Sequence, residues 1–268
     1  MTEETKFEPT ADSLLAILER LRAPGGCPWD REQTRQTLSR SLAEECAELL
    51  DAIDRDDPAD ICDELGDLFM NVLFQAVIAA EQGEFTYTDM VGNIVDKMVR
   101  RHAHIFGEAK AETAEEVTAL WVKIKEKEKA AAGKPRETSI LDGVGSYLTA
   151  LNRAEKLQKK VAKVGFDWAD QQGVVAKIEE ELAEVKAAMA EGDEAHVDEE
   201  IGDLLFVVAN LARFRKRATS EELLRAANRK FETRFRHIER RLAEDGVPLG
   251  EAGSARLEAL WREAKQIE

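Results

Sequence analysis

Aromatic residues and cysteines are scarce in this chain of 268 residues. Phe, Trp and Tyr make up only 6% of it, so the composition typical of strand-rich domains is missing. The three cysteines, Cys27, Cys46 and Cys62, have no C-x-x-C spacing, which argues against a disulfide framework and against a zinc site. A reducing cytoplasm is the location that this pattern predicts.

Long apolar runs are missing as well. No window of about 18 uncharged apolar residues occurs in the sequence. The first residues, MTEETKFEPTADS, lack the basic segment followed by an apolar segment that marks an export signal. We therefore expect no membrane contact and no export.

Positive charge is in deficit, since 38 Lys and Arg residues face 54 Asp and Glu residues, for a formal charge of -16. Such a chain repels the phosphate backbone of a nucleic acid, so nucleic acid is not an expected partner. A small phosphorylated ligand remains compatible with this charge if a divalent cation bridges it to acidic side chains.

Helix-forming residues are abundant: Ala, Glu, Leu, Lys and Arg dominate nearly the whole length. The length suits two domains of roughly 130 residues. A segment rich in Gly, Pro and polar residues, AAAGKPRETS, separates two strongly helical halves. We predict an all-α chain with an N-terminal domain at 1–132, a linker at 133–139 and a C-terminal domain at 140–268.

Several helix starts carry capping signals. An S/T-x-x-E capping box occurs at Thr113 with Glu116 and at Thr219 with Glu222. Asp57 followed by Pro58 is typical of a cap with proline in the first helical position. Asp30, after the breaker cluster that begins at Pro24, is expected to cap a further helix.

The two halves contain an internal repeat. The words EECAEL and DELGDL of the first half correspond to EELAEV and EEIGDL of the second. Four acids recur 136 positions further on: Glu45, Glu48, Glu64 and Asp67 correspond to Glu181, Glu184, Glu200 and Asp203. A basic pattern recurs at a spacing of 133, where Lys97 and Arg101 correspond to Lys230 and Arg234. Duplication of one helical module explains these matches.

The repeated acids predict a metal site. Residues three or four apart share one face of a helix, so two such pairs on antiparallel helices converge. Charged residues are absent from 68–80 and 204–212, so Asp67 and Asp203 are expected to enter buried helices. Gly66 and Gly202 suggest that helices approach closely there. Surface decoration is the alternative for a single copy, but the duplication favours Mg²⁺, or Mn²⁺, on oxygen ligands.

Two other kinds of site do not fit the residues. A di-iron bundle needs Glu-x-x-His, and none of the four histidines follows a glutamate at that spacing. The P-loop pattern G-x-x-x-x-G-K-[ST] is also missing. Any phosphate recognition must therefore use the metal and side chains, for which the repeated basic pairs are candidates, although a surface salt-bridge ladder is the alternative.

These motifs resemble those of a known family. The E-E-x-x-E of Glu44, Glu45 and Glu48, followed by the E-x-x-D of Glu64 and Asp67, is similar to the signature of the all-α nucleoside triphosphate pyrophosphohydrolases. The words GCPWD at 26–30 and VGFDW at 164–168 make the likeness specific to the two-repeat MazG proteins, over nearly the whole chain.

The resemblance implies an enzyme that cleaves the α–β phosphoanhydride of a nucleoside triphosphate, with Mg²⁺ held by both quartets, and a homodimer. It implies nucleotide contacts by Lys177, Lys230, Arg234 and Trp261, with Lys97, Arg101 and Trp121 as first-repeat counterparts. Glu180 and Glu44 are candidates to orient the attacking water beside Glu181 and Glu45. The alternative is a regulatory module that senses nucleotides with weak or no turnover.

The repeats are not equivalent. Lys177 lies one helical turn before Glu181, and its counterpart before Glu45 is Ser41. This difference favours the second repeat as the more competent site. Trp29 and Trp168 are open to two interpretations, core packing or a part in the base pocket.

Overall fold

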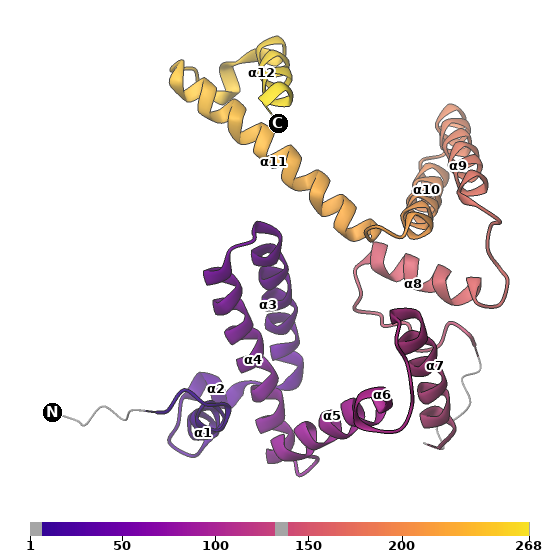
Figure 1. The fold of residues 1–268 in the computed structure, drawn as a ribbon. Coiled ribbons are helices and arrows are strands. Elements are labelled where there is room, and N and C mark those ends of the chain that lie inside the picture. Colours follow the sequence, from indigo (N-terminus) through magenta and orange to yellow (C-terminus); the bar gives the residue numbers. More distant parts are fainter. Residues whose placement is uncertain (1–6, 132–138, 268) are drawn as a thin grey trace. The chain divides into compact units, whose positions relative to one another are not determined.

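The computed structural model describes residues 7–131 and 139–267, and these form helices without any strand (Figure 1). The chain divides into two compact units, Met1–Lys134 and Pro135–Glu268. The all-α prediction is confirmed for the described residues. Apart from Ser139, the predicted linker lies outside them.

The first unit contains the helices α1 (Ala11–Arg22), α2 (Pro28–Glu32), α3 (Arg35–Arg55), α4 (Pro58–Glu81), α5 (Tyr87–Arg101), α6 (Ala103–Phe106) and α7 (Ala114–Ala131). Its central feature is the packed pair α3 and α4. The turn between them uses Asp56 in the left-handed conformation, with φ of 55°. Asp57 then caps α4 by accepting from the backbone N–H groups of Ala59 and Asp60, and Pro58 begins the helix as predicted.

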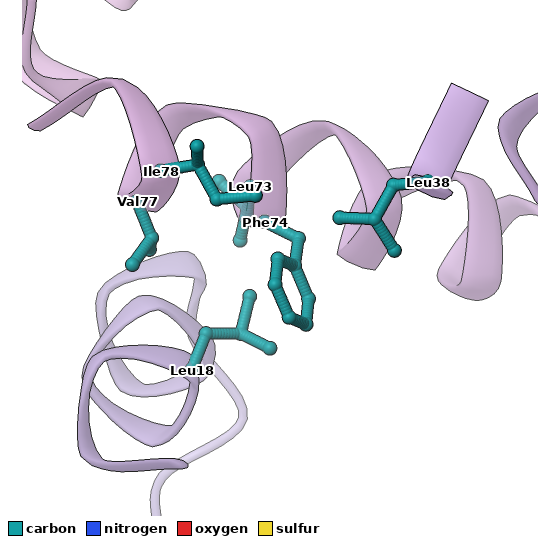
Figure 2. Close-up of a cluster of buried hydrophobic side chains, with 6 residues drawn as sticks. All are labelled: Leu18, Leu38, Leu73, Phe74, Val77 and Ile78. Carbon is teal, nitrogen blue, oxygen red and sulfur yellow. The ribbon is translucent and has the colours of Figure 1, made fainter. Parts of the chain in front are cut away.

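The core of this unit joins α1 to the hairpin. Figure 2 shows the buried cluster of Leu18, Leu38, Leu73, Phe74, Val77 and Ile78. Fully burying each such side chain contributes about 1.5–3 kcal/mol relative to exposure. The cluster therefore anchors the C-terminal half of α4 and leaves the acidic N-terminal half of that helix outside the core.

The second unit contains α8 (Ala150–Ala162), α9 (Gln171–Glu191), α10 (Glu194–Arg215), α11 (Ser220–Glu244), a 3-10 helix at Leu249–Glu251 and α12 (Gly253–Ile267). Helices α9 and α10 pack as a pair, and α8 packs on α10. Gly192 takes the left-handed conformation in the turn, and Asp193 caps α10. Helices α11 and α12 share a separate core of Ile238, Leu242 and Leu260.

The predicted capping boxes are present. Thr219 accepts from the backbone N–H of Glu222, and the Glu222 carboxylate accepts from the backbone N–H of Thr219. Thr113 and Glu116 make the same exchange. The prediction for Asp30 is wrong, because Asp30 lies inside the short α2 and Thr34 caps α3. The breaker cluster is thus followed by one extra helical turn before the long helix.

Two expectations about packing near the acids are also wrong for the described chain. A Cβ placed on Gly66 or Gly202 would meet nothing within 4 Å, so no helix of the same unit approaches closely there. Asp67 and Asp203 are exposed rather than buried. The uncharged stretches do form the packed parts of α4 and α10, but their buried residues begin further along, at Asn71 and Val207.

No helix among the described residues combines the length and the apolar character that a membrane crossing requires.

Candidate metal and nucleotide site

Three acids of the first repeat converge between α3 and α4. One carboxylate oxygen from each of Glu45, Glu48 and Glu64 lies within 4.8 Å of the other two. Glu45 and Glu48 are one helical turn apart on α3, and the short turn at Asp56 brings Glu64 of α4 alongside them. The predicted convergence is therefore present for three of the four acids.

The fourth acid, Asp67, lies outside this tight group but acts on it electrostatically. Partial burial raises the pKa of Glu45, and the charges of Asp67 and Glu48 raise it further. The pKa of Glu64 is raised by partial burial and then by Glu48 and Glu45. A group of like charges held this close has an unfavourable energy that a bound divalent cation relieves.

The second repeat builds the same group between α9 and α10. Oxygens of Glu181, Glu184 and Glu200 lie within 4.8 Å of one another. Glu181 is only 5% exposed, so its carboxylate requires a charged or hydrogen-bonding partner. Asp203 lies outside the tight group, one turn after Glu200, as Asp67 follows Glu64.

Basic side chains already contact the second group. The Lys177 ammonium lies 2.9 Å from Glu181 and 2.7 Å from Glu180, and these hydrogen bonds raise the pKa of Lys177. His196 Nε2 lies 2.9 Å from Glu200 Oε1. Sequence reasoning had missed His196, although its spacing of four from Glu200 on one helix was the available signal.

Three of the four predicted nucleotide contacts of the second repeat, Lys230, Arg234 and Trp261, lie on α11 and α12, whereas Lys177 lies on α9. The guanidinium of Arg234 lies over the ring of Trp261, 5.5 Å from its centroid, and Phe231 packs against the same ring at 5.3 Å. Lys230 is exposed one turn before Arg234. Helix α11 packs mainly on α8, α10 and α12, whereas the acids lie between α9 and α10.

A pocket of about 400 Å³ opens between α11 and α12. Arg234, Arg236, His237 and Arg240 contribute to its lining, together with Ala264 and Ile267 of α12. Planar guanidinium groups beside apolar side chains suit a ligand that combines phosphate oxygens with a less polar part.

The first-repeat counterparts have different neighbours. Arg101 donates to Glu128 of α7 at 2.7 Å, and Arg100 joins the same carboxylate, which lowers the pKa of Glu128 to about 2. Trp121 contacts the ring of His102, with centroids 5.1 Å apart. Lys97 is half-buried on α5. The basic pair of the first repeat is thus partly committed to an internal ion pair.

Trp29 and Trp168, which the sequence assigned either to core packing or to a base pocket, are not core residues of the part of the chain that the structure describes. Trp29 is 63% exposed and Trp168 is 38% exposed. Trp168 packs against the first turn of α9, where a Cβ on Gly173 would come within 2.8 Å of its ring.

Comparisons with known proteins match the two segments that carry these acids. The model of the MazG nucleotide pyrophosphohydrolase domain matches residues 33–106 and 170–239, and each segment contains one full set of four acids. The nucleoside triphosphate pyrophosphohydrolase of Escherichia coli K12 is 44% identical over 260 residues, which cover 96% of this chain and 97% of that protein.

Two further relatives cover nearly the whole of this chain. The nucleoside triphosphate pyrophosphohydrolase/pyrophosphatase MazG of Thermotoga maritima is 41% identical over 254 residues, 95% of each chain. The uncharacterized protein YabN of Bacillus subtilis is 43% identical over 94% of this chain, which corresponds to 51% of that longer protein. Both repeats therefore have counterparts in related proteins.

Proposed function

The chain belongs to the MazG nucleotide pyrophosphohydrolase family, and from that premise we propose that it hydrolyses nucleoside triphosphates to a nucleoside monophosphate and pyrophosphate. The observation that carries the proposal is the group of three converging carboxylates, which occurs once in each matched segment. Water adds to phosphorus, and the α–β phosphoanhydride breaks. The enzyme is therefore a hydrolase that acts on phosphoanhydrides.

The acidic groups suit a divalent cation. Their donors are all carboxylate oxygens, which Mg²⁺ and Mn²⁺ prefer, and we propose Mg²⁺ as the resident ion. The residues that would hold it are Glu181, Glu184, Glu200 and Asp203 in the second repeat and Glu45, Glu48, Glu64 and Asp67 in the first. A bound cation supplies positive charge that offsets the charge on the phosphate oxygens.

Basic and aromatic side chains would hold the nucleotide. In the second repeat these are Lys177, Lys230, Arg234 and Trp261, and the counterparts in the first are Lys97, Arg101 and Trp121. Arg234 lies over the Trp261 ring and lines the pocket, and Arg101 pairs with Glu128. Lys177, which contacts Glu181 and has Ser41 as its first-repeat counterpart, supports the second repeat as the more active one.

Two further carboxylates would orient the attacking water. Glu180 and Glu44 are exposed and each directly precedes a predicted metal ligand. A carboxylate in this place accepts a hydrogen bond from water and directs its lone pair towards phosphorus. Glu180 already holds the Lys177 ammonium, so its carboxylate is oriented towards the site.

Each unit by itself leaves apolar side chains exposed, and a second copy of the chain would cover them. The exposed positions repeat between the units: Ile53 with Met189, Leu65 with Ile201, Phe69 with Leu205, and Val72 with Val208. They lie on the helices that carry the acids. Contiguous apolar faces of this kind mark interfaces, and a symmetric homodimer is the simplest assembly that buries them.

The test is product analysis with a panel of nucleoside triphosphates, with Mg²⁺ and with EDTA. We expect monophosphate and pyrophosphate in equal amounts, only with the metal. Glu181→Gln should abolish most turnover and Glu45→Gln much less, while Glu191→Gln, an exposed acid at the end of α9, should leave turnover unchanged. Absence of metal-dependent turnover with every nucleotide would instead support a nucleotide-sensing module.

A further inference from the structure

The two carboxylate groups differ in the residue that lies four positions before the first acid that each helix contributes. In the second repeat, the residues four before Glu181 and four before Glu200 both have basic side chains. Lys177 contacts Glu181 at 2.9 Å, and His196 contacts Glu200 at 2.9 Å. Each pair has a spacing of four on one helix, which places the two side chains on the same face.

In the first repeat, neither corresponding position carries a cation. Ser41 takes the place of Lys177, and its hydroxyl donates a long hydrogen bond of 3.4 Å to Glu45. Asp60 takes the place of His196, and its carboxylate accepts from Arg55 at 2.8 Å. At these two positions the first group therefore has no counter-ion, whereas the second group has Lys177 on Glu181.

A counter-ion on a metal ligand competes with the metal. Glu181 is buried, and the Lys177 side chain is only 30% exposed, so solvent screens their interaction incompletely. A divalent cation that takes Glu181 must displace an ammonium group and then remain close to it. A nucleotide removes this conflict, because its phosphate oxygens offer the ammonium group a new partner.

We propose that Lys177 makes metal uptake by the second carboxylate group depend on nucleotide, while the first group binds a divalent cation by itself. This inference rests on the proposed function for the identity of the two ligands. Its consequence is that the second repeat binds the metal ion and the nucleoside triphosphate together. The first repeat is occupied at lower metal concentration, whether or not nucleotide is present.

The test is a Mn²⁺ titration of the full chain followed by electron paramagnetic resonance, which measures free Mn²⁺ without any turnover. It is run without nucleotide and then with a nucleoside triphosphate analogue that has a methylene group between the α and β phosphorus atoms. We expect one class of bound Mn²⁺ without the analogue and a second class with it. Glu45→Gln should remove the first class, and Glu181→Gln should remove the second.

Exchange of the two differing residues gives the sharper test. Lys177→Ser should strengthen nucleotide-independent Mn²⁺ binding at the second group by about tenfold or more, since a positive charge close to the ion is removed. Ser41→Lys should weaken binding at the first group by a similar factor. Lys177→Arg retains the charge and should leave nucleotide-independent Mn²⁺ binding at the second group as weak as in the wild type. Lys186→Ser, which removes an exposed lysine of the same helix, is the matched control.

The possible results separate this proposal from the proposed function. If both groups bind Mn²⁺ with equal affinity without nucleotide, and Lys177→Ser leaves that affinity unchanged, the proposed role of Lys177 is overturned. The proposed pyrophosphohydrolase activity would still stand. Absence of Mn²⁺ binding under every condition would overturn both this proposal and the metal assignment. Circular dichroism of each variant shows whether it is folded, and Ser41→Lys tests the same charge effect at the first group if Lys177→Ser unfolds.

Discussion

Arg22 of α1 holds the end of α4 through Glu81. Its guanidinium donates to the two carboxylate oxygens of Glu81 at 2.8 and 2.6 Å, and it also donates to the carbonyl oxygens of Asp30 and Gln33. The Arg22 side chain is only 8% exposed. One side chain thus joins α1, the short α2 and the hairpin that carries the first carboxylate group.

Substitution of Arg22 should therefore destabilise the first unit. Arg22→Lys is expected to lower the free energy of unfolding by about 1–3 kcal/mol, because an ammonium group cannot reproduce the fork and leaves carbonyl groups without a partner. Urea unfolding measures the change. Arg31→Lys, on the exposed face of α2, is the control. An equal effect of both substitutions would contradict the role assigned to the guanidinium fork.

Truncation of a core side chain should lower the free energy of unfolding more than truncation of an exposed side chain. Leu73 is fully buried in the cluster of α1, α3 and α4, so Leu73→Ala is expected to lower the free energy of unfolding by about 3 kcal/mol. Leu65, on the same helix, is 50% exposed, and Leu65→Ala should cost below about 1 kcal/mol at protein concentrations where the chain is monomeric. The comparison is made by unfolding at several dilutions.

The exposed apolar face should control self-association. Phe69→Ser and Leu205→Ser are each expected to weaken the proposed homodimer, since both side chains lie at equivalent positions of the two repeats. Sedimentation velocity over a range of concentrations measures the shift towards monomer. Tyr147→Ser removes a side chain that is 95% exposed elsewhere and should not alter the distribution. A monomeric wild type would refute the dimer.

The stability that the ion pair between α5 and α7 contributes should depend on pH. Arg101 and Arg100 hold the pKa of Glu128 at about 2, below its usual value of 4.5. A lowered carboxylate pKa means that the contribution of Glu128 to stability is complete above pH 4.5 and is lost as the pH falls towards 2. The difference in unfolding free energy between wild type and Glu128→Gln should therefore shrink over this range. A difference that is independent of pH would contradict this expectation.

Arg234 should act on nucleotide binding rather than on folding. Arg234→Gln is expected to raise the KM for a nucleoside triphosphate by about tenfold, since one charge-assisted contact to phosphate is lost. Steady-state kinetics with excess Mg²⁺ measures the effect. Arg256→Gln, which removes an exposed arginine in the first turn of α12 that pairs with Asp245 at the end of α11, should leave KM unchanged. If both variants retain the wild-type KM, Arg234 does not contact the substrate.

Local sequence rules predicted the parts of the site that depend on one helix or one turn. Asp57 and Pro58 begin α4 as expected, and the turn before them sets Glu64 beside the acids of α3. The helical spacing of three alone places Glu45 and Glu48 on one face. Such features need no information from distant residues, which is why they could be read from the chain.

Features that involve the environment of a helix were harder to predict. An uncharged stretch after Asp67 indicated burial, but a helix has several faces, and α4 packs only part of its surface within the chain. Gly66 indicated a close neighbour, yet the space beside it is open in one copy. The sequence records that a surface is apolar and not which element covers it.

The sequence by itself determined the helical class, the duplication and the convergence of carboxylates, because helical periodicity and capping act over a few residues. The tertiary structure alone decided how each acid is compensated. It buried the Glu181 side chain, placed the guanidinium of Arg101 on Glu128, and left the acids of the first repeat beside one another. The reason is that electrostatic energy depends on distance and burial, which only the packed helices establish.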